Sequence, residues 1–358
     1  MTERIGRERI PVGILGATGA VGQRLVERLD GHAWFEVREV GASRQSAGRP
    51  YGEAVTWRLP GDVPAAVAGL RVKDVTEPWE SVLLFSALDA AVAGGVEAQL
   101  AARGHAVMSN ARSHRLDPDV PLLIPEVNPD HLGLLALQRE RGPGILVTNP
   151  NCSAIGLCLA LAPLHRAFGV EAVEVVTLQS LSGAGYPGVA ALDAADNVIP
   201  FIEGEEPKLV EEPRKVLGRW TGAAVEPAQM TVSAQVHRVP VSEGHQLALS
   251  VKLRQAASPE EVSATLARLR GRPQELALPS APRFPIHVLS EPDRPQPRLD
   301  RDRERGMAIT VGRVRRCPVL DVRLSVLVHN TIRGAAGAAI LNAELCVAER
   351  HIPIESRP

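Results

Sequence analysis

Cys152 is the residue of this chain best suited to covalent chemistry. It stands in the segment 148–153 (TNPNCS), between an apolar run that predicts a strand and an apolar run that predicts a helix. We therefore expect Cys152 at a helix N-terminus, where the dipole lowers the pKa of the thiol and favours a thiolate that attacks acyl carbons. Backbone N–H groups and the Asn151 amide would stabilise the oxyanion. The other cysteines are interpreted as small buried residues: Cys158, Cys317 and Cys346.

A cysteine nucleophile needs a partner that exchanges protons near neutral pH, and histidine has its ordinary pKa there. Of the ten histidines, His245 is the strongest candidate. It closes the arginine-led segment 238–245 (RVPVSEGH) and precedes an alternating strand pattern. His237 is a rival on composition alone.

A glycine-rich turn near the start of the chain points to a bound dinucleotide. The segment 13–22 (GILGATGAVG) follows an apolar strand and enters a helix that runs to Leu29. Glycines allow a tight turn and let backbone N–H groups approach a pyrophosphate at the helix N-terminus. An ordinary turn between strand and helix is the alternative. The expected dinucleotide contacts in this turn are Gly13, Gly16, Ala17, Thr18, Gly19 and Val21.

The next strand should end near Val40, where a carboxylate would select NAD by binding the ribose 2′-hydroxyl. The segment 41–48 (GASRQSAG) has no carboxylate and offers Arg44, Ser43 and Ser46, which suit a 2′-phosphate. We therefore expect NADP as the cofactor, with a solvated loop arginine as the alternative. Further cofactor contacts are expected at Ser86, Ala87, Ser182, Gly183 and Gly185.

Short apolar runs that alternate with helical spacing fill the first part of the chain, and this alternation predicts a parallel sheet. The predicted strands are 11–15, 35–37, 81–85, 105–108 and 145–147, and the predicted helices are 25–29, 92–102 and 131–139. Asn128 is the expected cap of the last helix. The prediction is an α/β fold in which residues 1–150 form a Rossmann-type, doubly wound NADP-binding domain, completed by a C-terminal helix at 331–358.

The second part of the chain, residues 151–330, has a different texture. Strands are predicted at 173–177, 231–236, 247–251, 308–314 and 322–328, with one helix from Ser258 to Leu269. We expect a second α+β domain with a mainly antiparallel sheet that serves catalysis and dimerisation. The Pro-rich, charged segment 279–305 is predicted to be a long surface excursion.

Composition excludes several classes of function. Lys and Arg number 40 against 41 Asp and Glu, so the net charge of −1 gives no basic field for nucleic acid or an anionic membrane. Aromatic residues make up only 3%, which disfavours base-stacking platforms. The cysteines contain no C-x-x-C pair, and we expect no metal site. Residues 1–9 alternate charges where a signal peptide would be apolar, so a cytoplasmic location is expected.

Six segments resemble aspartate-β-semialdehyde dehydrogenases of the short archaeal and fungal-like branch. They are 16–23 (GATGAVGQ), 124–128 (IPEVN), 148–153 (TNPNCS), 182–188 (SGAGYPG), 238–245 (RVPVSEGH) and 329–336 (HNTIRGAA). The resemblance implies reversible conversion of aspartyl-4-phosphate and NADPH into aspartate semialdehyde, NADP and phosphate through a thioester, in the biosynthesis of lysine, threonine, methionine and isoleucine. It also implies a homodimer or homotetramer.

The resemblance implies a role for each matching residue. Cys152 is the expected nucleophile, His245 the acid and base, and Gln179 the residue that orients the acyl group. Arg238 would bind the substrate carboxylate, which suits a planar guanidinium. The remaining substrate and cofactor contacts are expected from Glu212 to the amine, from Lys215, Arg115 and Asn151 to the phosphate, and from Asn330 to the nicotinamide.

Three departures from the family pattern leave the substrate less certain than the reaction. They are Ala154, the segment 235–237 (QVH) and Arg112, which adds charge near the expected phosphate site. Alternatives within the same chemistry are a malonyl-CoA reductase and, less favoured, an N-acetyl-glutamyl-phosphate reductase. Alternatives of other classes are a cysteine–histidine acyl hydrolase or transferase, and a catalytically silent NADP-binding sensor.

Overall fold

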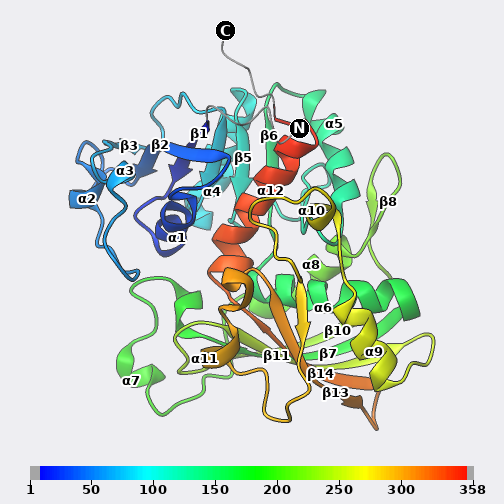
Figure 1. The fold of residues 1–358 in the computed structure, drawn as a ribbon. Helices are drawn as coiled ribbons and strands as arrows, with labels where there is room; N and C mark the ends of the chain where they lie inside the picture. Colours follow the sequence, from blue (N-terminus) through cyan, green and yellow to red (C-terminus); the bar gives the residue numbers. More distant parts are fainter. Residues whose placement is uncertain (1–8, 353–358) are drawn as a thin grey trace.

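Two six-stranded sheets organise the chain in this computed structural model, which describes residues 9–352 (Figure 1). The first sheet is entirely parallel, with strand order β3-β2-β1-β4-β5-β6, the order of a doubly wound dinucleotide-binding fold. Its strands are β1 (Ile10–Leu15), β2 (Phe35–Ala42), β3 (Val72–Asp74), β4 (Leu83–Ser86), β5 (Ala106–Ser109) and β6 (Ile145–Thr148). The sequence missed β3, which has only three residues.

Short helices connect these parallel strands, as crossover connections require. They are α1 (Ala20–Leu29), α2 (Tyr51–Ala54), α3 (Ala65–Ala68), α4 (Ala90–Ala102), η1 (Pro129–Gly133) and α5 (Leu134–Arg139). The expected cap at Asn128 is wrong in detail. Its side-chain oxygen accepts the backbone N–H of Ile124 at 2.8 Å, and its amide donates to the carbonyl of Leu122, so it ties the preceding loop instead.

The second sheet is mixed, with order β10-β7-β11-β14-β13-β12. Its three central pairs are antiparallel and its two outer pairs are parallel, so it is mainly antiparallel as predicted. The strands are β7 (Val170–Gln179), β10 (Thr231–Arg238), β11 (His245–Leu253), β12 (Ile286–Val288), β13 (Ile309–Arg316) and β14 (Val322–Val328). A separate small hairpin joins β8 (Arg219–Trp220) to β9 (Val225–Glu226).

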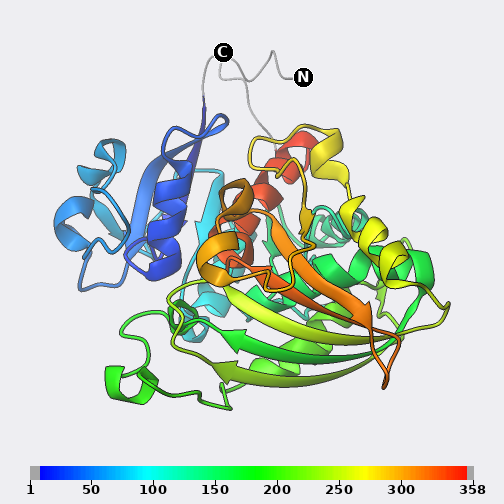
Figure 2. The same ribbon diagram turned by 60° about the horizontal axis from the view of Figure 1, so that its bottom comes forward.

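Helices α6 (Cys152–Phe168), α8 (Glu205–Val216) and α9 (Pro259–Ala267) accompany the second sheet, and Figure 2 shows its opposite face without helices over the strands. Helix α9 begins with the capping box of Ser258 and Glu261, in agreement with the sequence. The remaining short elements are η2 (Leu181–Ala184), α7 (Ala191–Ala194), α10 (Arg272–Glu275), α11 (Pro297–Asp300) and η3 (Arg303–Gly306).

The segment 279–305 is more ordered than a surface excursion. Residues Ile286–Val288 form β12 and pair with β13, and Ile286 is buried in the core of the second sheet. Asp300 is also buried, and its carboxylate forms an ion pair with Arg294. This ion pair helps to order a segment that has no apolar periodicity.

The chain returns to the first domain at its end. A π-helical turn (Ile332–Ala336) leads into α12 (Gly337–Ala348), whose Ile340 and Leu341 lie in the same core as the first sheet. The predicted helix at 331–358 is therefore too long at its C-terminal side. It ends at Ala348, and residues 353–358 lie outside the described range.

Candidate active site

The parallel strands of the first sheet bring the candidate residues to one edge. The glycine turn follows β1, the segment 43–46 follows β2, Ala87 follows β4, and Cys152 comes after β6. The carboxyl ends of parallel strands share an edge, and ligands bind there where the strand order reverses. In this sheet the reversal lies between β1 and β4.

Cys152 is the first residue of α6, as the sequence predicts. Asn151 caps the helix, because its side-chain oxygen accepts the N–H groups of Ser153 at 3.0 Å and Ala154 at 3.3 Å. The backbone of Gly334, in the π-helical turn, lies directly against Cys152. A Cβ atom at position 334 would lie 2.6 Å from the Cβ of Cys152, so this contact requires glycine.

The expected low thiol pKa is wrong for the protein without ligands. Burial, together with the charge of Glu205, raises the pKa of the Cys152 thiol to about 12. The charges of Arg115 and Lys208 and the backbone N–H of Ser153 oppose this shift but do not overcome it. The helix N-terminus alone therefore does not produce a thiolate here, and Cys152 rests as a thiol.

His245 opens β11 and is fully buried. The backbone N–H of Ser180 donates to its Nδ1 at 3.0 Å, so the neutral ring carries its hydrogen on Nε2. That Nε2 has no partner in the described part of the chain. Burial, together with the positive charge of Arg238, lowers the pKa of His245 to about 3, so the imidazole rests neutral. Within residues 9–352, no hydrogen bond joins His245 to Cys152.

Arg238 ends β10 beside the same histidine. Its Nη1 donates to the carbonyl of Ser180 at 2.7 Å, and its charge interacts with Cys152 and Glu205. A Cβ atom at Gly183 would lie 2.8 Å from the Arg238 guanidinium and 3.0 Å from Nε2 of His245, so both groups meet at this glycine. The arginine therefore holds its charge beside the unpartnered Nε2 of His245.

Glu205, which the sequence analysis did not select, is the carboxylate at the centre of the site. It is 7% exposed and accepts the side-chain amides of Asn151 at 3.0 Å and Gln179 at 3.3 Å. Lys208, one helical turn further along α8, donates to it as well. The side-chain amide of Asn151 thus donates to Glu205. The oxyanion contact expected from Asn151 is therefore left to the backbone N–H groups at the start of α6.

Glu212 and Lys215 occupy places that differ from the predicted ones. Glu212 accepts Nη1 of Arg115 at 2.9 Å and the backbone N–H of Asn151 at 2.6 Å. The Lys215 ammonium donates to the carbonyls of residues 115, 117 and 120 at 2.7 to 2.8 Å, so all three of its donors are used. Both residues build the wall of the site, and Lys215 has no donor left for a phosphate.

The spacing of the sequence does not distinguish Glu212 and Lys215 from a second pair on the same helix. Glu205-x-x-Lys208 and Glu212-x-x-Lys215 have the same i, i+3 spacing and are seven residues apart on one helix. Two helical turns separate the pairs, so both fall on the same face and periodicity does not distinguish them. Only the tertiary position of the α8 N-terminus beside Cys152 decides between them.

The glycine turn has the geometry of a dinucleotide cradle. Gly16 has φ +77°, and a Cβ there would lie 2.6 Å from the carbonyl oxygen of Ala87. Helix α1 begins after Gly19 without a side-chain cap, so its first N–H groups remain available to a pyrophosphate. Ser86 presents a buried hydroxyl that has no partner in the described range 9–352.

Gly13 has a packing role instead of the expected cofactor contact. It is buried in β1, and a Cβ atom there would lie 2.8 Å from the Trp79 ring. At the end of β2, Ser43 and Arg44 are exposed, and Arg44 pairs with Asp74 at 3.3 Å. An exposed ion pair of this kind is weak and exchanges readily for a stronger anion such as a phosphate.

Asn330 fastens the loops above the site. Its side-chain oxygen accepts the Ser180 hydroxyl at 3.1 Å and the N–H of Gly244 at 2.9 Å, and its amide donates to Ser182 at 2.8 Å. One amide hydrogen is left for the expected nicotinamide contact. Gly183 and Gly185 belong to the same loop, and Gly185 has φ +69°.

Two searches of the described residues complete the picture of the site. Between residues 9 and 352, no three metal-ligating side chains lie close enough together to hold a metal ion. No helix in this range is long and apolar enough to cross a membrane.

The fold and the site together define a class, the two-domain oxidoreductases that bring a dinucleotide to a reactive cysteine. Two family models match the chain: "Semialdehyde dehydrogenase, NAD binding domain" over residues 11–135 and "Semialdehyde dehydrogenase, dimerisation domain" over residues 161–333. The chain belongs to the semialdehyde dehydrogenase family.

Individual relatives carry a more specific name. The aspartate-semialdehyde dehydrogenase of Archaeoglobus fulgidus is 48% identical over 96% of this chain and 100% of that protein. The Schizosaccharomyces pombe protein of the same name is 45% identical over 94% of this chain and 97% of its own. The structure of the Candida albicans aspartate-semialdehyde dehydrogenase with NADP has a TM-score of 0.88 and 41% identity, and the match covers 96% of this chain and 99% of that one.

Proposed function

We propose that this protein is an NADP-dependent aspartate-semialdehyde dehydrogenase. It reduces aspartyl-4-phosphate to aspartate 4-semialdehyde with release of phosphate, reversibly, through a thioester on Cys152. The observation that carries this proposal is the set of charged groups around one sulfur: a carboxylate (Glu205), a guanidinium (Arg238) and an ammonium (Lys208). The two relatives at 48% and 45% identity, both named for this reaction, support it.

Each charged group matches one group of the substrate. Glu205 would bind the substrate ammonium, and Arg238 would bind the α-carboxylate in a bidentate contact. Lys208 and Arg115 would hold the phosphate, because both charges lie close enough to act on Cys152. Glu212 then acts as a positioning residue for Arg115, and Lys215 for the loop 115–120. Gln179 would orient the acyl group.

Substrate binding favours thiolate formation. The substrate ammonium neutralises Glu205, and that removes one of the two causes that raise the pKa of Cys152. The sulfur then attacks the acyl carbon while the thiol proton passes to the departing phosphate oxygen. The bond from that carbon to this oxygen breaks, and hydrogen phosphate leaves against Lys208 and Arg115. Backbone N–H groups at the start of α6 face the oxyanion.

His245 holds a proton at Nε2 on the side of the reacting carbon. That N–H donates a hydrogen bond to the oxyanion of each tetrahedral species and keeps its proton. After hydride transfer the oxyanion re-forms the carbonyl of the aldehyde, and the Cys152 sulfur leaves as a thiolate that is reprotonated from solvent. NADPH, bound along the glycine turn, supplies the hydride that reduces the thioester. Ser180 is a positioning residue, because its N–H fixes the His245 tautomer.

The residues at the edge of the first sheet fit NADP. The turn at Gly16 has the left-handed backbone and the close approach to Ala87 that require glycine, as in a dinucleotide-binding turn. Ser43, Arg44 and Ser46 follow the end of β2, where the adenosine ribose binds in such folds. The unpartnered hydroxyl of Ser86 is a further donor on the same edge. Arg44 would exchange Asp74 for the 2′-phosphate.

The decisive experiment follows NADPH absorbance in the reverse reaction with aspartate semialdehyde and phosphate, and with arsenate in place of phosphate. We expect turnover with both anions and none with Cys152→Ala. Turnover of malonyl-CoA in preference to aspartyl phosphate would contradict the proposal, and Glu205 already disfavours it because that substrate has no amine.

We further propose that copies of this chain associate through the uncovered face of the second sheet, as a homodimer or homotetramer, in the cytoplasm. Gln235, Val176, Ala248 and Ser325 are paired in register across four strands and present an uncharged row. A sheet face without helices that carries such a row is suited to a second copy.

A further inference from the structure

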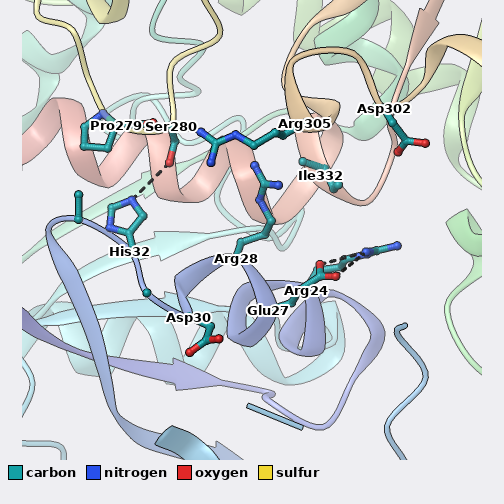
Figure 3. A pocket seen from close by; sticks show the side chains of 12 residues that line it. Arg24, Glu27, Arg28, Asp30, His32, Pro279, Ser280, Asp302, Arg305 and Ile332 are labelled. Carbon is teal, nitrogen blue, oxygen red and sulfur yellow. Dashed lines mark hydrogen bonds and ion pairs between the residues drawn. The ribbon is translucent and has the colours of Figure 1, made fainter. Parts of the chain in front are cut away.

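A cavity of about 590 Å³ lies between α1 of the first domain and residues of the segment 279–305 (Figure 3). It is found at the C-terminal end of α1, whereas the dinucleotide turn precedes the N-terminal end of that helix. Neither Cys152 nor His245 lines it. The cavity is therefore separate from the proposed active site, and its size is that of a small-molecule site.

Two guanidinium groups reach into this cavity from opposite walls, from Arg28 on α1 and Arg305 on η3 (Figure 3). Arg28 forms no ion pair within residues 9–352, and Arg305 donates only to the carbonyl of Pro279, at 3.3 Å. Burial and the charge of Arg305 lower the pKa of Arg28, which shows how close together the two cations lie. Like charges held together without an anion are costly.

The carboxylates in the walls form no ion pair with Arg28 or Arg305 within residues 9–352, although the charge of Glu27 partly offsets that of Arg28. Glu27 bonds Arg24 at 3.0 Å. Asp302 lies within 3.6 to 3.7 Å of His329 and Arg301. Asp30 points away from both guanidiniums (Figure 3). Each acid is thus engaged elsewhere or turned outward.

The backbone that carries Arg305 is strained. Glu304 and Arg305 have φ values of 50° and 57°, in the left-handed region that residues with a Cβ rarely adopt. Glu304 is held there because its carboxylate accepts the N–H of Arg283 at 3.2 Å and contacts His287 at 3.3 Å. Strain of this kind occurs at ligand sites, where it fixes a side chain in advance.

A hydroxyl donor completes the cavity. His32 accepts the N–H groups of Trp34 and Phe35 at Nδ1, so its Nε2 carries the hydrogen and donates to Glu344 at 2.8 Å. The Ser280 oxygen is 3.4 Å from the same Nε2 and can accept from it, which leaves the hydroxyl hydrogen for a ligand. Ile332 and Pro279 add an apolar wall.

We propose that this cavity binds a phosphate dianion, between Arg28 and Arg305 and next to the Ser280 hydroxyl. Two guanidiniums that converge on one point match the several oxygens and double charge of a phosphate. The dianion comes either from free phosphate or from a small phosphomonoester whose body fills the rest of the cavity.

Two measurements test this site. Crystals soaked in tungstate, a tetrahedral dianion, should show an anomalous peak between Arg28 and Arg305. Calorimetric titrations with glycerol 3-phosphate and with inorganic phosphate should show binding to the wild type that weakens at least tenfold in Arg28→Gln and in Arg305→Gln. Arg103→Gln, at the exposed end of α4, is the matched control and should bind as the wild type does.

The two titrations show whether the bound dianion is free phosphate or part of a phosphomonoester. Of inorganic phosphate and glycerol 3-phosphate, the one whose affinity falls more in the variants is the ligand of this cavity. Phosphate that binds at the proposed active site is recognised separately. Its binding isotherm should remain in both variants, because Arg28 and Arg305 lie outside that site. Unchanged affinities in Arg28→Gln and Arg305→Gln would overturn the proposal. A tungstate peak without variant-sensitive binding in solution would show an adventitious ion only, and would overturn it as well.

Discussion

At the scale of single residues, the neutral state of the reacting pair is the main finding. The thiol of Cys152 has its pKa raised to about 12, and the imidazole of His245 has its pKa lowered to about 3. Burial dominates both shifts, because it disfavours a charged sulfur and a charged ring alike. Cys152 and His245 therefore form no thiolate–imidazolium pair, and reactivity depends on the charges that a substrate brings.

This resting state predicts a steep pH dependence for alkylation of the empty enzyme. Because the pKa of Cys152 lies above the assay range, the thiolate fraction and the iodoacetamide rate should rise about tenfold per pH unit from pH 6 to 10. The rate is measured in a Cys317→Ser background, since Cys158 and Cys346 are buried. A plateau below pH 8 would mean that the free enzyme already holds a thiolate.

The two lysines of α8 should separate into a substrate group and a structural group. Lys208→Met should raise KM for phosphate at least tenfold in the reverse reaction and leave thermal stability nearly unchanged. Lys215→Met leaves three carbonyls without their donor and should cost about 1–3 kcal/mol of unfolding free energy, measured with urea. A raised KM in Lys215→Met and a loss of stability in Lys208→Met would instead support Glu212 and Lys215 as the substrate-binding pair, as the sequence alone predicts.

At the scale of elements, the contact between the π-helical turn and α6 sets the position of the nucleophile. Gly334→Ala would place a Cβ 2.6 Å from that of Cys152, so the helix start must shift. We expect kcat to fall by about 100-fold, since displacements near 1 Å at a reacting atom have effects of this size.

The control for this prediction is a helical glycine with open space around it. Gly95→Ala in α4 meets no atom within 4 Å and should keep full activity with equal or slightly higher stability. Wild-type kcat in Gly334→Ala would show that the turn does not constrain Cys152.

At the scale of the whole molecule, side chains from both domains hold the two halves together around the site. Arg24 on α1 bonds Glu243 at 2.7 Å, two residues before His245. The guanidinium of Arg58 stacks on the Tyr186 ring, with its central carbon 4.2 Å from the ring centroid, and so links the first domain to the loop over the site. These contacts place the dinucleotide turn and the cysteine against each other.

Association of two copies through the uncovered sheet face is the corresponding prediction. Ala248→Arg would bury a charge in the proposed interface and should yield monomers in analytical ultracentrifugation at micromolar concentration. Ala98→Arg, on an exposed position of α4, is the control and should leave the mass unchanged. An Ala248→Arg protein of wild-type mass would exclude this face as the interface.

The sequence by itself determined the features that local chemistry controls. The glycine turn, the alternation of strands and helices, the Ser258 cap and the position of Cys152 at a helix start all follow from residue type and spacing. Each depends on neighbours within a few residues. The parallel first sheet was also predictable, because consecutive strand–helix units have essentially one handed arrangement.

Only the tertiary structure decided which charged residues face the sulfur and what their protonation states are. Glu205 and Glu212 have the same spacing to a lysine, and the packing of α8 against α6 alone brings Glu205 to Cys152. Gly13 and Gly16 are equivalent candidates in the glycine-rich turn when only the sequence is considered. In the structure, however, the Trp79 ring packs against Gly13. Burial depends on residues distant in the chain, and for that reason the high pKa of Cys152 could not be predicted from its helix position.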